Sequence, residues 1–102
     1  MTTQEQLKQV FDDNFVAYFR SHVAHVNIVG RNFASDHALL NGIYDELQDE
    51  IDRIGELLRS LDAFMPASLS TVIADSNIMD AEVAGSADNL IATVLYLSLI
   101  HI

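Results

Sequence analysis

The sequence of 102 residues has no cysteine, one proline and four glycines. Without cysteine the chain has no disulfide framework, no zinc finger and no thiol nucleophile, so any metal must be bound by histidine and carboxylate side chains. Because 50% of the residues are hydrophobic and 20% are charged, the composition also excludes a disordered or collagen-like chain. A chain of this length forms one domain at most, since domains usually have about 100–200 residues.

Basic residues are also few: five Lys and Arg stand against 15 Asp and Glu, which gives a formal net charge of −10. Because proteins bind the phosphate backbone of DNA with clustered Lys and Arg, DNA binding by this chain is doubtful. The start, Met1 to Val10, lacks the apolar segment of a signal peptide. The apolar stretch 90–102 is shorter than the roughly 18–20 residues that cross a bilayer. These absences predict a cytoplasmic location and no membrane partner.

Apolar residues recur with helical spacing in two long segments. Between Gln4 and Val29, the apolar or half-apolar residues are separated by three, four or sums of these steps, as one helix face requires. These residues are Leu7, Phe11, Tyr18, His22, His25 and Val29. We expect Gly30 to end this helix, because glycine readily adopts the left-handed conformation that closes a helix.

The second helix is expected to be capped by Ser35 or Asp36, whose side chains accept hydrogen bonds from free backbone N–H groups. Its apolar residues lie three or four positions apart, close to the 3.5-residue repeat of long antiparallel helices in bundles. They are Leu40, Ile43, Leu47, Ile51, Ile54, Leu58 and Leu61. This spacing predicts that the second helix packs along the first one.

The rest of the chain is less regular. A short connector helix is predicted from Ala67 to Ala74, with Pro66 near its first turn. A third long helix is predicted to begin at Ala87, with Ser86 as its cap. The predicted fold class is therefore all-α, with two long antiparallel helices, a short connector helix and the start of a third long helix.

The last six residues are unusual. Leu97 to Ile102 is the translation of CTG TCT CTT ATA CAC ATC, the end sequence of a sequencing transposon adapter. We therefore expect the natural reading frame to break near Tyr96, so that residues 1–102 are a truncated single domain. The alternative is an apolar helix that happens to end in this way. We exclude residues 97–102 from fold reasoning and do not consider His101 a metal ligand.

Residues that can carry chemistry are concentrated in the two long helices. Asp52 and Glu56 lie four apart and only about 40° from each other around the helix, so their carboxylates share a face. Asp45 and Asp49 form a second such pair. A bound cation would relieve the repulsion between like charges at this spacing, but a solvated acidic face is the alternative interpretation.

Two histidines are candidates for a metal site. His25 and His37 are separated by a turn that can bring both to one end of the helix pair, whereas we expect His22 to belong to the core. Two imidazoles with Asp52 and Glu56 suit Fe(II), Zn or Mn. Because Asp52 lies about 22 Å along the second helix from His37, one subunit cannot close this site. An antiparallel two-fold partner can supply the carboxylates, since such an interface brings residue i of one chain to residue j of the other.

The segment from His25 to Phe33, followed by His37, Tyr44-Asp-Glu-Leu47 and Asp52-x-x-x-Glu56, resembles the Dps family of ferritin-like proteins. The resemblance covers roughly residues 7–69. It implies a ferritin-like four-helix bundle, incomplete in this chain, and a two-fold dimer within a hollow dodecamer. It also implies a ferroxidase centre in which His25 and His37 face Asp52 and Glu56 of a neighbouring subunit. The implied cofactor is iron, which is stored as a ferric mineral.

Three positions depart from the family's pattern. The family commonly has an Asp ligand four residues after the second His, and this position is Asn41. An amide can still bind iron through its oxygen, but weakly, because it carries no charge. The Trp usual after the first His is Val26, and the Lys-rich tail of the family is replaced by a segment whose only base is Lys8.

These observations leave three functions open. The first is an iron-storage and detoxification ferroxidase that oxidises Fe(II) with peroxide or dioxygen and guides it to an acidic cavity. The second is a non-enzymatic helical shell or adaptor with a decayed metal site, which Asn41 and Val26 favour. The third is nucleoid compaction, which the charge balance disfavours.

Overall fold

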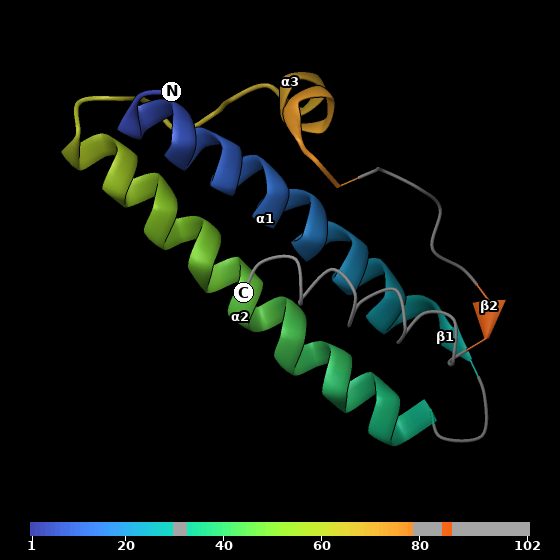
Figure 1. Ribbon diagram of the computed structural model, residues 1–102. Coiled ribbons are helices and arrows are strands. Elements are labelled where there is room, and N and C mark those ends of the chain that lie inside the picture. Colours follow the sequence, from blue (N-terminus) through green and yellow to red (C-terminus); the bar gives the residue numbers. More distant parts are fainter. Residues whose placement is uncertain (30–32, 79–84, 87–102) are drawn as a thin grey trace.

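The computed structural model describes residues 1–29, 33–78 and 85–86 (Figure 1). Its elements follow the order α1 (Thr3–Asn27), β1 (Ile28–Val29), α2 (Phe33–Ser60), α3 (Leu69–Asp75) and β2 (Gly85–Ser86). Figure 1 shows α1 and α2 side by side and antiparallel, with the short α3 over the N-terminal half of α1. The all-α architecture predicted from the sequence is therefore confirmed, whereas the third long helix expected from Ala87 and residues 97–102 lie outside the described residues.

Helix α1 begins with a side-chain cap that the hydrophobic pattern did not reveal. The Thr2 hydroxyl accepts a hydrogen bond from the backbone N–H of Glu5 at 3.1 Å, which satisfies one of the free donors at the helix start. The Glu5 carboxylate in this first turn also lies near the positive end of the helix dipole. The cap and the charge together fix where α1 starts.

Helix α1 ends earlier than Gly30, so the expected glycine cap is wrong. The last helical residue is Asn27, and the C-cap is Ile28 in an extended conformation, with its N–H donating to the Ala24 carbonyl. Ile28 and Val29 then form a two-residue strand, β1, which pairs in parallel with β2. The pairing requires extended backbone, and it ends the helix before the glycine is reached.

Helix α2 begins earlier than expected. Because its first residue is Phe33, Ser35 and Asp36 lie inside the first turn, and the prediction that either residue caps the helix is wrong. The Asp36 carboxylate still stabilises this end of the helix, because negative charge is favourable near a helix N-terminus.

Helix α3 is shorter than the predicted connector helix. Its N-cap is Ser68, whose hydroxyl accepts from the Thr71 N–H at 3.4 Å, so the helix begins at Leu69 rather than at Ala67. Pro66 therefore precedes the helix and is not part of its first turn. A serine that satisfies a free N–H group defines a helix start better than a nearby proline does.

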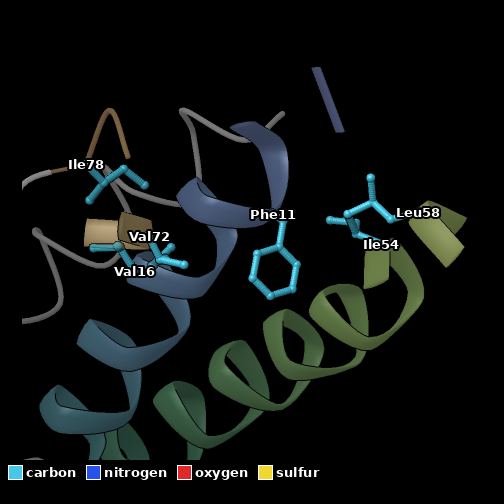
Figure 2. Close-up of a cluster of buried hydrophobic side chains, with 7 residues drawn as sticks. Phe11, Val16, Ile54, Leu58, Val72 and Ile78 are labelled. Carbon is cyan, nitrogen blue, oxygen red and sulfur yellow. The ribbon is translucent and has the colours of Figure 1, made fainter. Parts of the chain in front are cut away.

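The main hydrophobic core lies where α1 and α2 meet the α3 region, which consists of α3 and the residues that follow it up to Ile78. Figure 2 shows the Phe11 ring between α1 and α2, Ile54 and Leu58 on α2, and Val16 of α1 close to side chains of the α3 region. The buried members of this cluster are Phe11, Val16, Ala17, Ile54, Leu58, Val72 and Ile78. A second, smaller cluster consists of Ala24, Ile28 and Leu40, near the other end of the helix pair.

The predicted apolar stripes are confirmed except at the last residue of each, Val29 and Leu61. Leu40, Ile54 and Leu58 are buried, whereas Leu61 is 37% exposed because α2 has already ended at Ser60. Val29 is 60% exposed because it lies beyond the end of α1.

Polar contacts join α1 to the segment that follows α3. Asp13 Oδ1 accepts hydrogen bonds from the Asn77 N–H at 2.7 Å and from the Ser76 hydroxyl at 3.1 Å. The Gln9 side-chain amide donates to the Asp75 carbonyl at 2.8 Å. These bonds hold the C-terminal end of α3 against α1, so that Val72 stays in the core.

A buried carboxylate lies beside this junction. Asp12 is 4% exposed, and its Oδ1 atom has no hydrogen-bond partner within the described part of the chain. Burial and, to a smaller extent, the nearby carboxylates of Asp75 and Asp13 raise the pKa of Asp12 to about 6, while Lys8 opposes the shift. None of the helices in the described segments is both long and apolar enough to span a membrane.

Candidate metal centre

The turn between α1 and α2 brings His25 and His37 into direct contact. His25 lies in the last turn of α1, and His37 lies in the second turn of α2. Their imidazole rings stack with centroids 3.6 Å apart and an angle of 26° between the ring planes. The prediction that these two histidines meet at one end of the helix pair is therefore confirmed.

Each histidine is also bonded to the backbone of the other. His25 Nδ1 lies 2.9 Å from the His37 carbonyl oxygen, and His37 Nδ1 lies 2.8 Å from the His25 carbonyl oxygen. Because a carbonyl can only accept, both Nδ1 atoms carry the proton. In the neutral rings the lone pair is then on Nε2, the form in which imidazole binds a metal.

Neighbouring rings hold this pair in place. Phe33 stacks on His37 with centroids 5.1 Å apart, and the Tyr44 ring meets His25 edge-on at 5.0 Å. His25 is only 8% exposed, whereas His37 is half-buried. The two rings therefore have little rotational freedom, and a metal can approach the pair only from a limited range of directions.

The other predicted ligands lie on exposed positions of α2. Asn41 is one helical turn after His37, and Asp52 and Glu56 are one turn apart further along the helix. Asp52 is 15 residues from His37, which corresponds to about 22 Å along a helix. Within residues 1–29, 33–78 and 85–86, no group of three or more His, Cys, Asp or Glu side chains is arranged to hold a metal ion. One copy of the chain thus brings together the histidines without the carboxylates.

Most of the acidic side chains of α2 face solvent. Asp45 and Asp49 are exposed, as are Asp52 and Glu56. Among the described residues, the ion pair of α2 joins Arg53 to Glu50 at 3.6 Å, between side chains that are 73% and 45% exposed. Such an exposed pair contributes little to stability. Because the other exposed acidic side chains named here take no part in this pair, α2 presents a largely negative surface.

Three aromatic residues next to the histidine pair form a group that the sequence did not predict. The Tyr18 hydroxyl lies 3.1 Å from His22 Nδ1, and the His22 ring stacks flat on Tyr44 with centroids 4.2 Å apart. His22 is half-buried within the α1–α2 interface, which agrees with the expected core role but adds a polar contact. The i, i+4 spacing of Tyr18 and His22 was the signal for this contact.

Val26 follows His25 and is 63% exposed. Its side chain points away from the core that buries its neighbour, because adjacent residues of a helix lie on different faces. Val26 therefore adds an apolar group to the surface beside the histidines.

Comparison with known proteins shows which sequences and folds this chain resembles. No family model matches the sequence. Antigen TpF1 from Treponema pallidum (strain Nichols) is 37% identical over 76 residues, which are 74% of this chain and 43% of that protein. The crystal structure of TpF1 has a TM-score of 0.87 at 32% identity and covers 95% of this chain, which in turn covers 63% of the TpF1 chain.

Solved Dps structures share the same fold. Dps from Listeria monocytogenes has a TM-score of 0.88 at 19% identity, over 98% of this chain and 66% of that one. A Dps protein from Bacillus brevis has a TM-score of 0.78 at 26% identity, over 98% of this chain and 70% of that one. The resemblance to ferritin-like Dps bundles is thus confirmed, for a chain that spans less than half the length of the curated relative TpF1.

Proposed function

We propose that this chain, which has the fold of the Dps proteins, is a subunit that binds Fe(II) and oxidises it with peroxide or dioxygen between two subunits. The observation that carries the proposal is the reciprocal bonding of His25 and His37. It fixes two imidazoles with their rings in contact and with the proton on Nδ1, the tautomer that leaves Nε2 available to a metal.

We propose that the remaining ligands, Asp52 and Glu56, come from the two-fold partner. These carboxylates are exposed in the isolated chain and lie too far along α2 to reach the histidines of their own subunit. An isologous interface between antiparallel α2 helices would pair the histidine end of one subunit with the carboxylate end of the other. Each dimer would then contain two equivalent sites.

Exposed apolar side chains support an assembly of subunits. Phe64 is 76% exposed, Leu69 is 64% exposed and Met65 is 46% exposed, all within α3 or the segment that precedes it. An apolar cavity of about 180 Å³ between α1 and α3 is lined by Phe15, Val16, Phe19, Leu69 and Ile73. Exposed apolar surface that lies beside an apolar cavity is a candidate for contact with another chain. We propose a two-fold dimer that assembles further into a hollow dodecamer in the cytoplasm.

In the proposed reaction, iron is the substrate. The two imidazoles and two carboxylates provide nitrogen and oxygen ligands that suit Fe(II), and the carboxylates offset the charge that increases on oxidation to Fe(III). The acidic surplus of the chain favours transfer of the product to a negatively charged interior. DNA compaction is not part of the proposal, because a net charge of −10 opposes binding to the phosphate backbone.

A non-enzymatic shell is the second candidate, and Asn41 is the observation that favours it. Asn41 is exposed one turn after His37, and its amide supplies no negative charge to a bound cation. If the site has decayed in this way, the chain assembles but does not oxidise iron.

One experiment separates the two candidates. The protein is titrated with Fe(II) under anaerobic conditions, and peroxide is then added while the ferric absorbance is followed. Ferroxidase function predicts saturable binding and rapid oxidation that are both lost when His25 and His37 are replaced by alanine, with assembly unchanged in size-exclusion chromatography. Assembly with no oxidation above a protein-free control would identify the shell.

A further inference from the structure

The two histidines of the candidate metal centre have unequal surroundings. His25 is 8% exposed, and its ring meets Tyr44 edge-on at 5.0 Å and His22 at 6.1 Å. His37 is only half-buried, and the rings that stack on it within the described segments are those of His25 and Phe33. His25 is therefore confined by the interface between α1 and α2, whereas the orientation of the His37 ring depends on its two stacking partners.

Phe33 and His25 cover opposite faces of the His37 ring. The centroid of the His25 ring lies 3.6 Å from that of His37, and the Phe33 centroid lies 5.1 Å from it, with angles of 26° and 27° between the ring planes. Because one face of an imidazole has no room for two stacked rings, Phe33 covers the face that His25 leaves open. Phe33 is the first residue of α2, four positions before His37, and side chains at this spacing are neighbours on a helix. Since Phe33 is itself 45% exposed, it forms the outer layer of the stack.

The covered ring makes the hydrogen bond on which the metal-binding form of His37 depends. Its Nδ1 donates to the His25 carbonyl oxygen at 2.8 Å, and this bond fixes the ring orientation and keeps the lone pair on Nε2. Without the Phe33 ring, water would reach the open face of the imidazole and compete for the Nδ1 proton and for the carbonyl. The imidazole would also be free to turn, which would break the bond and move Nε2. An aromatic stack opposes both changes, because it excludes water and is favourable beyond the area that it buries.

We propose that Phe33 is a positioning residue, which holds the His37 imidazole so that Nδ1 stays on the His25 carbonyl and Nε2 remains available to a metal. The inference rests on the proposed function for the role of Nε2, and it deepens that function by assigning part of the metal affinity to a side chain that touches no metal. The effect is expected on one histidine only. His25 Nδ1 donates to the backbone carbonyl of His37, which is fixed within α2, so loss of the Phe33 ring should release the His37 ring and spare the His25 ring.

Three variants separate the aromatic stack from other effects. Phe33→Leu keeps an apolar side chain and removes the ring, whereas Phe33→Trp keeps an aromatic ring and adds no metal ligand. Phe64→Leu is the matched control, because Phe64 is 76% exposed and its ring lies 4.6 Å from the guanidinium carbon of Arg59, beyond the end of α2 that is opposite to the histidines. Because all three variants replace exposed side chains, we expect them to fold.

The first measurement needs no metal. The full chain is isotope-labelled at histidine, and the exchange of each ring Nδ1–H with water is followed by NMR. We expect the His37 proton to exchange several-fold faster in Phe33→Leu than in the unchanged protein, and at the unchanged rate in Phe33→Trp and Phe64→Leu. The His25 proton should stay protected in all of these proteins.

The same spectra contain the results that overturn the proposal. One is a His37 ring proton that exchanges equally fast in Phe33→Leu and in the unchanged protein, or that is too labile to observe in the unchanged protein. Another is a loss of protection in Phe33→Trp as large as that in Phe33→Leu, which would exclude aromatic stacking as the cause. The backbone N–H of Leu40, which is buried three residues after His37, is the internal reference. If its exchange accelerates by the same factor, Phe33 only holds the start of α2.

Anaerobic titration with Fe(II) then tests the consequence for metal binding. In samples of the same oligomeric state, we expect the Fe(II) affinity to fall about three- to tenfold in Phe33→Leu, and by less than about twofold in Phe33→Trp and Phe64→Leu. An affinity of Phe33→Leu equal to that of the unchanged protein contradicts the inference. If the unchanged protein itself binds no Fe(II), the proposed function fails, and the exchange measurement decides whether Phe33 holds the His37 ring.

Discussion

His25 and His37 each donate a ring N–H to the other's backbone carbonyl, at 2.9 and 2.8 Å. The end of α1 and the start of α2 are therefore connected by the same two side chains that are the candidate metal ligands. A substitution at one position removes the N–H donor of the other residue's carbonyl and the ring that stacks on the other imidazole. Structural and functional effects of substitutions at these two positions are consequently coupled.

Replacing His37 with alanine should weaken both metal binding and the fold. The variant removes one ligand, leaves the His25 carbonyl without its ring N–H donor and removes the ring that stacks on His25, which costs about 1–3 kcal/mol of unfolding free energy. Leu39→Ala is the control, because Leu39 is 48% exposed and lies on the same part of α2. Fe(II) titration and chemical denaturation of both variants check this. Unchanged stability in His37→Ala would show that the bond from the His37 ring to the His25 carbonyl contributes nothing to the fold.

Asp12 should make stability depend on pH. Its pKa is raised in the folded protein from 3.8 to about 6, so folding favours the neutral form. The contribution of Asp12 to the unfolding free energy should therefore be most favourable below about pH 4. This contribution should fall by about 3 kcal/mol as the pH rises through about 6. Thermal melts between pH 4 and 8 measure the effect.

Asp12→Asn is the variant that isolates this contribution. Because it keeps the shape and removes the charge, we expect a more stable protein at neutral pH and a flatter pH profile between about pH 4 and 7. Asp13→Asn is the contrasting control, because Asp13 accepts hydrogen bonds from the segment after α3. We expect this variant to be less stable than the unchanged protein at every pH. A profile for Asp12→Asn that parallels the unchanged protein would contradict the assignment.

Leu57 and Leu58 provide a matched test of the core. Leu58 is fully buried and Leu57 is 48% exposed, although they are neighbours in the same helix. Leu58→Ala should cost about 2–5 kcal/mol of unfolding free energy, whereas Leu57→Ala should change it by less than about 1 kcal/mol. Urea denaturation of the two variants distinguishes them, and equal losses would mean that the packing between α1 and α2 is not as described.

The sequence was sufficient to predict the two long helices and the meeting of His25 with His37. Periodic apolar residues determine which helix faces are buried, and the turn length determines which ends meet. The helix ends were wrong because they depend on side-chain caps such as Thr2 and Ser68 and on the pairing of β1 with β2. The burial of Asp12 had no local signal, because it results from α3 folding back over α1.

Asn41→Asp should strengthen metal binding if this position faces the site. Adding a carboxylate one turn after His37 supplies a negative charge, and we expect the Fe(II) affinity to rise about tenfold, or roughly 1.4 kcal/mol. Gln48→Asp is the control, because it adds the same charge to an exposed position on the same helix. Isothermal titration under anaerobic conditions gives both affinities. Equal increases in affinity in the two variants would show that the added charge attracts Fe(II) only in a general way, and that residue 41 is not at the metal site.

The central claim is that each site takes its histidines from one subunit and its carboxylates from another. A complementation measurement tests it by combining two inactive proteins, one with His25→Ala and His37→Ala and one with Asp52→Ala and Glu56→Ala. The two are unfolded, mixed in equal amounts and refolded together, and the initial rate of Fe(II) oxidation by peroxide is measured. Random pairing restores one intact site in each mixed dimer, so the account predicts about a quarter of the rate of the unchanged protein. A mixture as inactive as its two components, with dimers present, would contradict a site shared between subunits.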